Sequence, residues 1–309
     1  MEQIRSLSQL IEGAKKLCAE KGKKRLSVAM AEDAGLIAAI EEARKAGMVE
    51  ATLVGNPDRV RACIQEAGAS EKDYNVIEER NEAKCGIVAV TEVSAKRADI
   101  YMKGQLPTDH FLRGMLNKEV GLRSGKTISH CYFHHIPGYD RVLFIADAAF
   151  NMYPDVKQKA DILQNTVNFA RALGVECPKV ACLAAVEVVN PDMPCTLDAC
   201  ALVQMNQRGQ IRNCIVDGPL ALDNAINEEA AKIKKINSPV AGHADILFVP
   251  QIEVGNVLAK SITYFSRDSE TGGLIIGAAA PVILTSRADP MRAKLLSIAG
   301  AVMMAHHKG

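Results

Sequence analysis

The stretch PVILTSRADPMRAKLLSIAGAVMMAHH, residues 281–307, contains the unit from which the fold is expected to be built. Its first five residues predict an apolar strand, a polar turn follows, and Asp289 with Pro290 is typical of a helix start. Such a helix presents unpaired N–H groups beyond the carboxyl end of the strand, where α/β proteins bind anions. Ser286 and Arg287 in the turn therefore predict a phosphate or oxyanion site. The alternative is that Asp289 is only a helix cap and Arg287 only a surface charge.

Short apolar runs alternate with helical periodicity along the rest of the chain. Further strands are predicted at 26–30, 51–55, 74–78, 98–103, 127–133, 141–147, 179–185, 213–218 and 245–250, and helices at 34–47, 57–67, 80–93, 108–117, 155–173, 194–207, 219–233, 254–265 and 290–306. This alternation predicts an α/β fold with largely parallel, helix-covered sheets. The length favours two domains, a discontinuous first one of 1–128 plus 285–309 and a second of 129–284, with an interdomain cleft.

Composition narrows the function classes. The 309 residues include 37 basic and 36 acidic side chains, a net charge of +1, so neither nucleic acid nor a membrane surface is an expected partner. The nine cysteines form no CxxC pair, which predicts reduced thiols. The N-terminus has no secretory leader pattern, and we expect a cytoplasmic protein. Three histidines, His130, His134 and His135, are interpreted as packing or surface residues rather than metal ligands.

A second polar group lies in MKGQLPTDHFLRGML, residues 102–116. Lys103 ends a predicted strand, Thr108 starts a helix, and Arg113 lies in the second turn of that helix. One interpretation is a second anion subsite. The other is that Thr108 caps the helix while Lys103 and Arg113 are solvated.

Further polar residues follow predicted strands from the middle of the chain onward. Asn151 follows the strand that ends at Asp147, Glu187 follows the strand at 179–185, and Asn256 lies at a helix start. Each has a structural alternative, such as a side chain that caps a loop. Because the carboxyl ends of parallel strands meet at one edge of a sheet, their joint placement predicts a binding site.

Seven segments, in the same order along the chain, resemble the phosphate acetyltransferase and phosphate butyryltransferase family. They are MAEDAGLIAAIEEARKAG, KGQLPTDHFLRGML, FIADAAFNMYP, EVVNPDMPCTLDA, RGQIRNCIVDGPLALDNAI, DILFVPQIEVGNVLAK and PVILTSRADP. The fourth, fifth and seventh are most similar to the butyryltransferase branch. The resemblance implies an isocitrate/isopropylmalate dehydrogenase-like fold, a homodimer, and no metal or redox cofactor.

The resemblance also implies a reaction: a short acyl group, butyryl or similar, passes reversibly between CoA and inorganic phosphate, with acyl-CoA and acyl phosphate as the acyl carriers. The Ser-Arg pair of the family falls on Ser286 and Arg287, and its other phosphate-binding Arg on Arg113. In the acetyl branch, an Asp seven residues after the Ser is the proposed base for the CoA thiol. The corresponding position in this chain is Ala293, so the acidic residue nearest to the Ser-Arg pair is Asp289, which becomes the candidate base. A third Arg of that branch falls on Tyr264.

Three alternatives remain open at the level of sequence. One is a phosphate acetyltransferase that acts on acetyl-CoA. Another is a non-catalytic acyl-CoA-sensing module, which the retained Ser286 and Arg287 disfavour. The last is a decarboxylating dehydrogenase of similar fold, which would need metal-binding aspartates and a nucleotide site, and the sequence has no GxGxxG loop after a strand.

Overall fold

The computed structural model describes residues 2–285 and 289–307, and the chain divides into two compact units. The N-terminal unit comprises 8–126 and 272–309, and the central unit comprises 1–7 and 127–271. Residues 272–284, which we expected in the second domain, pack in the N-terminal unit. The division of the chain into the two predicted domains stays a prediction.

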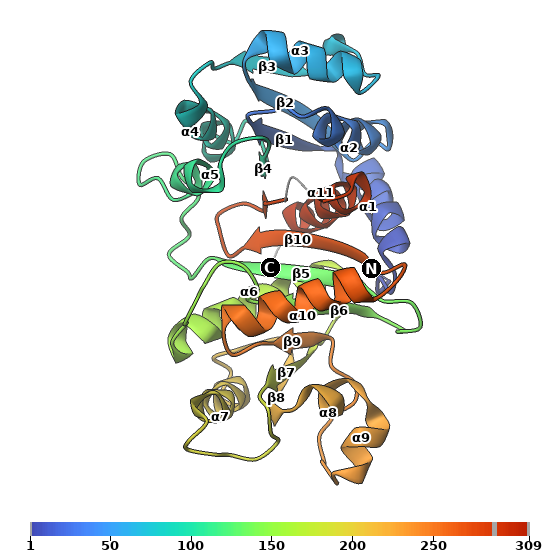
Figure 1. The fold of residues 1–309 in the computed structure, drawn as a ribbon, viewed down its shortest axis with the longest axis vertical. Helices are drawn as coiled ribbons and strands as arrows, with labels where there is room; N and C mark the ends of the chain where they lie inside the picture. Colours follow the sequence, from blue (N-terminus) through green and yellow to red (C-terminus); the bar gives the residue numbers. More distant parts are fainter. Residues whose placement is uncertain (1, 286–288, 308–309) are drawn as a thin grey trace. The chain divides into compact units, whose positions relative to one another are not determined.

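The described residues of the N-terminal unit form six strands in the order β3-β2-β1-β4-β11-β10 (Figure 1). Their bounds are Lys24–Ala29 (β1), Val49–Gly55 (β2), Asn75–Glu78 (β3), Ile100–Lys103 (β4), Glu270–Ile276 (β10) and Val282–Ile283 (β11). All neighbouring pairs are parallel except β10 with β11. Strand β10 was not predicted, because its ETGG start lacks the apolar pattern of a strand.

Helices cover both faces of these strands, with α2 and α11 on one side and α4 and α5 on the other (Figure 1). The helices of this unit are Leu7–Lys21 (α1), Ala34–Lys45 (α2), Pro57–Glu66 (α3), Glu82–Ser94 (α4), Thr108–Met115 (α5) and Met291–His306 (α11), with a 3₁₀ turn at Glu71–Asp73. Capping side chains determine where several of these helices begin. Asp33, for example, accepts a hydrogen bond from the Leu36 N–H at 2.6 Å, which satisfies an unpaired donor of the first turn of α2.

In the central unit, the part of the chain that the structure describes forms five strands in the order β5-β6-β9-β7-β8. They are Ser129–His135 (β5), Val142–Ala146 (β6), Lys179–Leu183 (β7), Ile215–Leu220 (β8) and Ile246–Phe248 (β9). Only the pair β5 and β6 is antiparallel. The α/β class with mostly parallel strands, expected from the βα alternation, is therefore confirmed.

The helices of the central unit are Val156–Ala172 (α6), Pro194–Gln207 (α7), Leu222–Ile226 (α8), Glu228–Ile233 (α9) and Ile252–Phe265 (α10). The one helix expected over 219–233 is split into α8 and α9, because Asn227 takes an extended backbone and caps α9 through the Ala230 N–H. One core of the unit gathers Ile145, Leu183, Leu247 and Val240 beneath Leu258 and Ile262 of α10. Across the described residues, no helix is both long and apolar enough to cross a bilayer.

Candidate active site at the carboxyl ends of the strands

Two of the predicted polar groups lie at one edge of the strands in the N-terminal unit. Strands β4 and β11 are parallel neighbours in which Val282 pairs with Tyr101 and Ile283 with Met102. Both strands therefore end at the same edge, and this register brings Lys103 and Thr285 to it. Both residues are buried, at 5% and 8% exposure. The interpretation in which Lys103 is solvated is therefore wrong.

Close backbone packing fixes the end of β4. The Lys103 ammonium group donates a hydrogen bond to the Gly104 carbonyl at 3.3 Å. A Cβ atom at Gly104 would lie 2.2 Å from the Met30 carbonyl oxygen, so only glycine fits between the ends of β1 and β4. The Gln105 N–H then donates to the same Met30 carbonyl at 2.8 Å. The position of Lys103 is thus set by main-chain contacts on both sides.

The proposed catalytic pair Ser286 and Arg287 lies outside the described residues. Asp289, the third residue expected there, is half-buried. The N-cap of α11 is Pro290, and the helix begins at Met291. The expectation that Asp289 caps this helix, with Pro290 as its first residue, is therefore wrong by one position. A pyrrolidine ring cannot supply a capping side chain, and within the described part of the chain Pro290 makes no side-chain cap hydrogen bond.

Thr108 and Arg113 lie on α5, which follows β4. Thr108 was expected to cap this helix, but the N-cap is Pro107 and Thr108 is the first helical residue. The Thr108 side chain is exposed, and no side-chain cap hydrogen bond is formed. The Arg113 side chain is 76% exposed, and its guanidinium lies 3.5 Å from the Asp109 carboxylate one turn earlier. Such a surface pair holds the side chain only weakly, so Arg113 is accessible to an anion.

In the central unit, Asn151 holds the loop that follows β6. Its side-chain amide donates to the Ile128 carbonyl at 2.8 Å and to Asp147 Oδ2 at 2.5 Å. Asp147 in turn accepts hydrogen bonds from the N–H groups of Ala149 and Phe150, both at 3.0 Å. Burial raises the pKa of the Asp147 carboxyl, and these donors oppose the shift. The structure therefore places Asn151 in a loop-holding role, and the predicted contact with substrate stays a prediction.

Asn256 and Glu187 lie after neighbouring strands of the same unit. Asn256, on α10, donates to the Ala148 carbonyl at 3.1 Å and so supports the loop that Asn151 holds. Glu187 follows β7 and accepts from the Lys234 ammonium at 3.2 Å and from the Asn224 amide at 3.4 Å. Asn151 and Asn256 therefore share one loop, while Glu187 belongs to a separate charged group.

A buried ion pair that was not predicted from the sequence lies beside a large pocket in the central unit. Lys159 of α6 and Asp198 of α7 lie 2.5 Å apart, and the Lys159 side chain is 7% exposed. Both line a pocket of about 910 Å³ with apolar walls that include Leu183, Leu222 and Val257. Lys159 follows Lys157 in a polar run of α6, so its sequence context gives no sign that it is buried.

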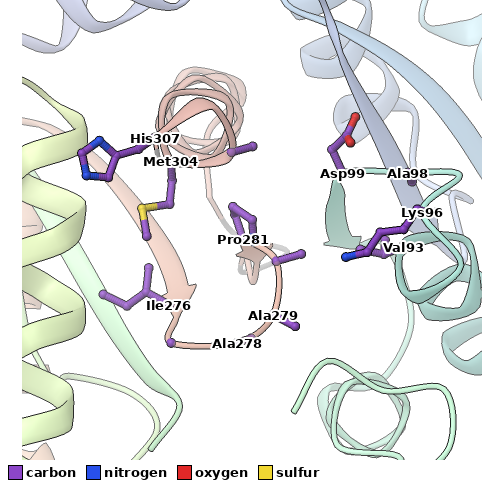
Figure 2. Close-up of a pocket in the computed structure, with 13 residues that line it drawn as sticks. Val93, Lys96, Ala98, Asp99, Ile276, Ala278, Ala279, Pro281, Met304 and His307 are labelled. Atoms are coloured by element: carbon purple, nitrogen blue, oxygen red, sulfur yellow. The ribbon is translucent and has the colours of Figure 1, made fainter. Parts of the chain in front are cut away.

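A second pocket, of about 320 Å³, lies at the opposite ends of the strands in the N-terminal unit. Figure 2 shows Lys96 and Asp99 on one side of it and Met304 and His307 on the other. Asp99 precedes β4 and Pro281 precedes β11, so the pocket is at the amino ends of these two parallel strands. Ligands of α/β sheets bind at the carboxyl ends, and we therefore do not assign the active site to this pocket.

No group of three or more His, Cys, Asp or Glu side chains suited to a metal ion occurs within 2–285 and 289–307. Two of the three histidines considered above are buried. His130 is 2% and His134 is 0% exposed, and burial lowers their pKa values to about 4 and about 3. His135 is half-buried, and its ring lies 3.9 Å from the Glu270 carboxylate. The packing interpretation is confirmed for His130 and His134.

The mostly parallel strands, with polar residues at their carboxyl ends, place the chain in the α/β class, in which ligands commonly bind at that edge of the sheet. Residues 72–302 match the family described as phosphate acetyl/butaryl transferase. The chain is 47% identical over 305 residues to the phosphate butyryltransferase of Clostridium acetobutylicum, which covers 99% of this chain and 100% of that protein. The chain belongs to the phosphate acetyl/butaryl transferase family.

Two further comparisons agree with this membership. The phosphate acetyltransferase of Thermotoga maritima is 42% identical over 299 residues, which covers 97% of this chain and 99% of that protein. The crystal structure of a branched-chain phosphotransacylase from Enterococcus faecalis V583 matches with a TM-score of 0.81 at 31% identity, over 92% of this chain and all of that chain. The resemblance stated from the seven segments is thus confirmed.

Proposed function

We propose that this protein is an acyltransferase that moves a short acyl group, butyryl or a similar chain, reversibly between CoA and inorganic phosphate. Family membership along nearly the whole chain supports the reaction. The observation that carries the site is the shared edge of β4 and β11, where the buried Lys103 lies at the end of β4 and the buried Thr285 directly precedes Ser286 and Arg287 in sequence. A buried ammonium group at strand ends suits the phosphate that the reaction consumes or releases.

In the proposed reaction, the CoA thiolate attacks the carbonyl carbon of the acyl phosphate. A C–S bond forms, the C–O bond to phosphate breaks, and inorganic phosphate leaves with the electron pair of that bond. Arg287, Arg113 and Lys103 hold the phosphoryl oxygens by charge-assisted hydrogen bonds. Ser286 donates a hydrogen bond to the developing oxyanion or to the leaving phosphate.

The thiol of CoA has to lose its proton, because the thiolate is the nucleophile and an ordinary thiol has a pKa of about 8.5. Asp289 is the proposed base. Ala293 stands where the acetyl branch has its acid, so Asp289 is the carboxylate nearest to the Ser-Arg pair in sequence. The proposed reaction uses CoA as a substrate and needs no cofactor.

The decisive experiment measures thiol release from acyl-CoAs of two to five carbons, with and without phosphate. We expect phosphate-dependent release that is greatest for butyryl-CoA or a similar chain. Greatest release from acetyl-CoA would instead identify a phosphate acetyltransferase. Binding of acyl-CoA with no thiol release from any of these acyl-CoAs would favour a sensing module and overturn the proposal.

Variants at the proposed site test the residue roles separately from the reaction. Ser286→Ala and Arg287→Ala should each lower turnover strongly, whereas the exposed Lys118→Ala on the same unit should not. Near-normal rates in both site variants would remove their proposed roles but leave the reaction standing.

We also propose a cytoplasmic location and a homo-oligomer. The isocitrate/isopropylmalate dehydrogenase-like class, with two domains and a cleft, stays a prediction.

A further inference from the structure

The pocket of about 910 Å³ in the central unit lies where α/β sheets bind their ligands. Leu183 is the last residue of β7, and Pro250 stands two residues after the end of β9, so both mark the carboxyl ends of neighbouring parallel strands. The starts of α7, α8 and α10 add Cys195, Leu222 and Val254 to the walls. Both this position and this volume are typical of a small-molecule site, for which about 300–1,000 Å³ is usual.

The walls of this pocket are mostly aliphatic, and several of their side chains remain in contact with water. Val257 is 65%, Val254 40% and Leu222 38% exposed. Leu258 and Met193 extend the same lining. Covering exposed aliphatic surface is favourable, and a cluster of such surface around a pocket marks a binding site. Part of the ligand that fits is therefore an apolar chain.

Polar groups interrupt this lining and keep hydrogen-bonding capacity for a ligand. The buried Lys159 ammonium carries three donors, and its hydrogen-bond partner among the described residues is the Asp198 carboxylate. Gln251 is the N-cap of α10, but its half-buried side chain makes no cap hydrogen bond. Ammonium, carboxylate and amide together offer donors and acceptors on one wall. This combination suits a ligand that carries amide groups, each with one N–H and one carbonyl oxygen.

The charges at the pocket disfavour an anionic ligand. Among the described residues, the charged part of the lining consists of one cation, Lys159, and two anions, Asp198 and Glu253, a sum of −1. Asp198 neutralises Lys159 directly, because the two groups lie 2.5 Å apart. Glu253 is exposed and adds an unbalanced negative charge. A phosphate or a carboxylate would be repelled by this lining, whereas an uncharged chain would not.

The CoA thioester of the proposed reaction contains one part with this chemistry. Its nucleotide end carries phosphates, but its pantetheine arm is uncharged, contains amide groups and ends in the acyl chain. We propose that the pocket binds the acyl-pantetheine arm, with its aliphatic groups against Leu222, Val254 and Val257 and an amide group at Lys159 and Asp198. The nucleotide end lies outside the pocket. This inference rests on the proposed function, and it implies that acyl-pantetheine binds here without any nucleotide.

Titration of the full-length protein with butyryl-pantetheine is the first test. NMR of protein with labelled leucine and valine methyl groups locates the ligand, and we expect saturable shifts of the signals of Leu222, Val254 and Val257. Adenosine 3′,5′-bisphosphate, a probe of the nucleotide end, should leave these signals unchanged. The proposal is overturned if butyryl-pantetheine at millimolar concentration does not shift them, or if the bisphosphate shifts them equally.

A charge placed on the wall tests whether the aliphatic lining carries the binding. Val257→Glu adds a carboxylate beside Val254 and should raise the dissociation constant for butyryl-pantetheine by about tenfold or more. Ile233→Glu is the matched control, because Ile233 is 74% exposed on α9 of the same unit and stands outside the lining. Circular dichroism checks that both variants fold, as expected for exposed positions. An unchanged dissociation constant in Val257→Glu contradicts the proposal.

A comparison of ligands tests the amide contact with Lys159 and Asp198. The butyryl thioester of 2-mercaptoethanol keeps the acyl chain but lacks the amide groups. Because a hydrogen bond to a charged group contributes more than a neutral one, this thioester should bind about tenfold more weakly than butyryl-pantetheine. Equal affinity for the two thioesters would remove the role assigned to Lys159 and Asp198.

All of these experiments measure binding and not turnover. An active enzyme whose pocket signals ignore butyryl-pantetheine would overturn this inference and leave the proposed acyl transfer standing. A protein that binds butyryl-pantetheine in the pocket but releases no thiol would support the inference and overturn the acyl transfer.

Discussion

The ammonium group of Lys159 lies 2.5 Å from the Asp198 carboxylate and ties α6 to α7 at the wall of the large pocket in the central unit. Helix α6 packs on β6, after which Asn151 follows, and α7 packs on β7, after which Glu187 follows. The Lys159 side chain is 7% exposed and Asp198 29%. A charge as buried as Lys159 is tolerated only when it is paired, so this contact constrains both helices.

Replacing Lys159 should destabilise the protein. Lys159→Met leaves the Asp198 carboxylate without its cation, and we expect the free energy of unfolding to fall by about 1–3 kcal/mol. The double variant Lys159→Met, Asp198→Leu should recover most of this loss, because neither side chain then carries a charge. Urea unfolding measures both. Lys157→Met, an exposed change on the same helix, should stay within about 0.5 kcal/mol. Equal losses for Lys157→Met and Lys159→Met would show that the ion pair contributes nothing.

Lys103 should govern the affinity for phosphate. Lys103→Met removes a buried cation from the shared edge of β4 and β11, and we expect the KM for phosphate to rise more than tenfold. The KM for acyl-CoA should change much less. Initial-rate assays at varied phosphate measure the effect, with the exposed Lys118→Met as control. An unchanged KM for phosphate would place Lys103 outside the anion site.

Asn151 should contribute more to the stability of the protein than an ordinary surface amide does, because it holds the loop after β6. Asn151→Ala removes two hydrogen bonds, one of them to the carboxylate of Asp147, and leaves that buried group poorly satisfied. The free energy of unfolding should fall by about 1–3 kcal/mol in urea titrations. Asn168→Ala removes one bond between neighbouring turns of α6 and serves as the control. A loss no greater than that of the control would contradict the loop-holding role.

Acid should destabilise the protein through its buried histidines. His130 and His134 have pKa values of about 4 and about 3 in the fold, below the ordinary value of about 6.5 that the unfolded chain has. The unfolded chain therefore binds more protons below pH 6.5, and stability should fall as the pH drops from 6.5 toward 4. For His130 alone, the loss is on the order of 3 kcal/mol.

His130→Phe tests this pH dependence. Nδ1 of His130 has no hydrogen-bond partner among the described residues, and the ring packs edge-on against Tyr132, so an aromatic replacement keeps the packing. The variant should lose less stability than the unaltered chain between pH 6.5 and 4, as followed by thermal unfolding at each pH. Parallel curves for the two proteins would show that His130 does not contribute.

The sequence predicted most strands and helices because their signals are local. The apolar run before Lys103 and the helix after Pro107 are examples, since both follow from neighbouring residues. It failed where local signals were absent or misleading. Strand β10 starts with ETGG, and Thr108 has the side chain of a cap although Pro107 occupies that position. Caps differ by one residue because the backbone angles that define them depend on the whole turn.

The candidate site was predicted only in part for the same reason. The sequence marked Lys103 and the 281–290 stretch as strand ends, but it did not show that β4 and β11 are neighbours. That adjacency comes from hydrogen bonds between segments about 180 residues apart in the chain, which no local pattern encodes. The pairing of Lys159 with Asp198 was missed likewise, because each residue alone resembles a solvated helix charge.

By itself, the amino-acid sequence determined the α/β class, the family and the residue types that can handle phosphate, because periodicity and motif order survive without coordinates. The tertiary structure alone decided which strand ends are neighbours, that Lys103 is buried, and that Asn151 holds a loop. Burial and adjacency arise from contacts between distant segments, and these exist only once the chain has folded.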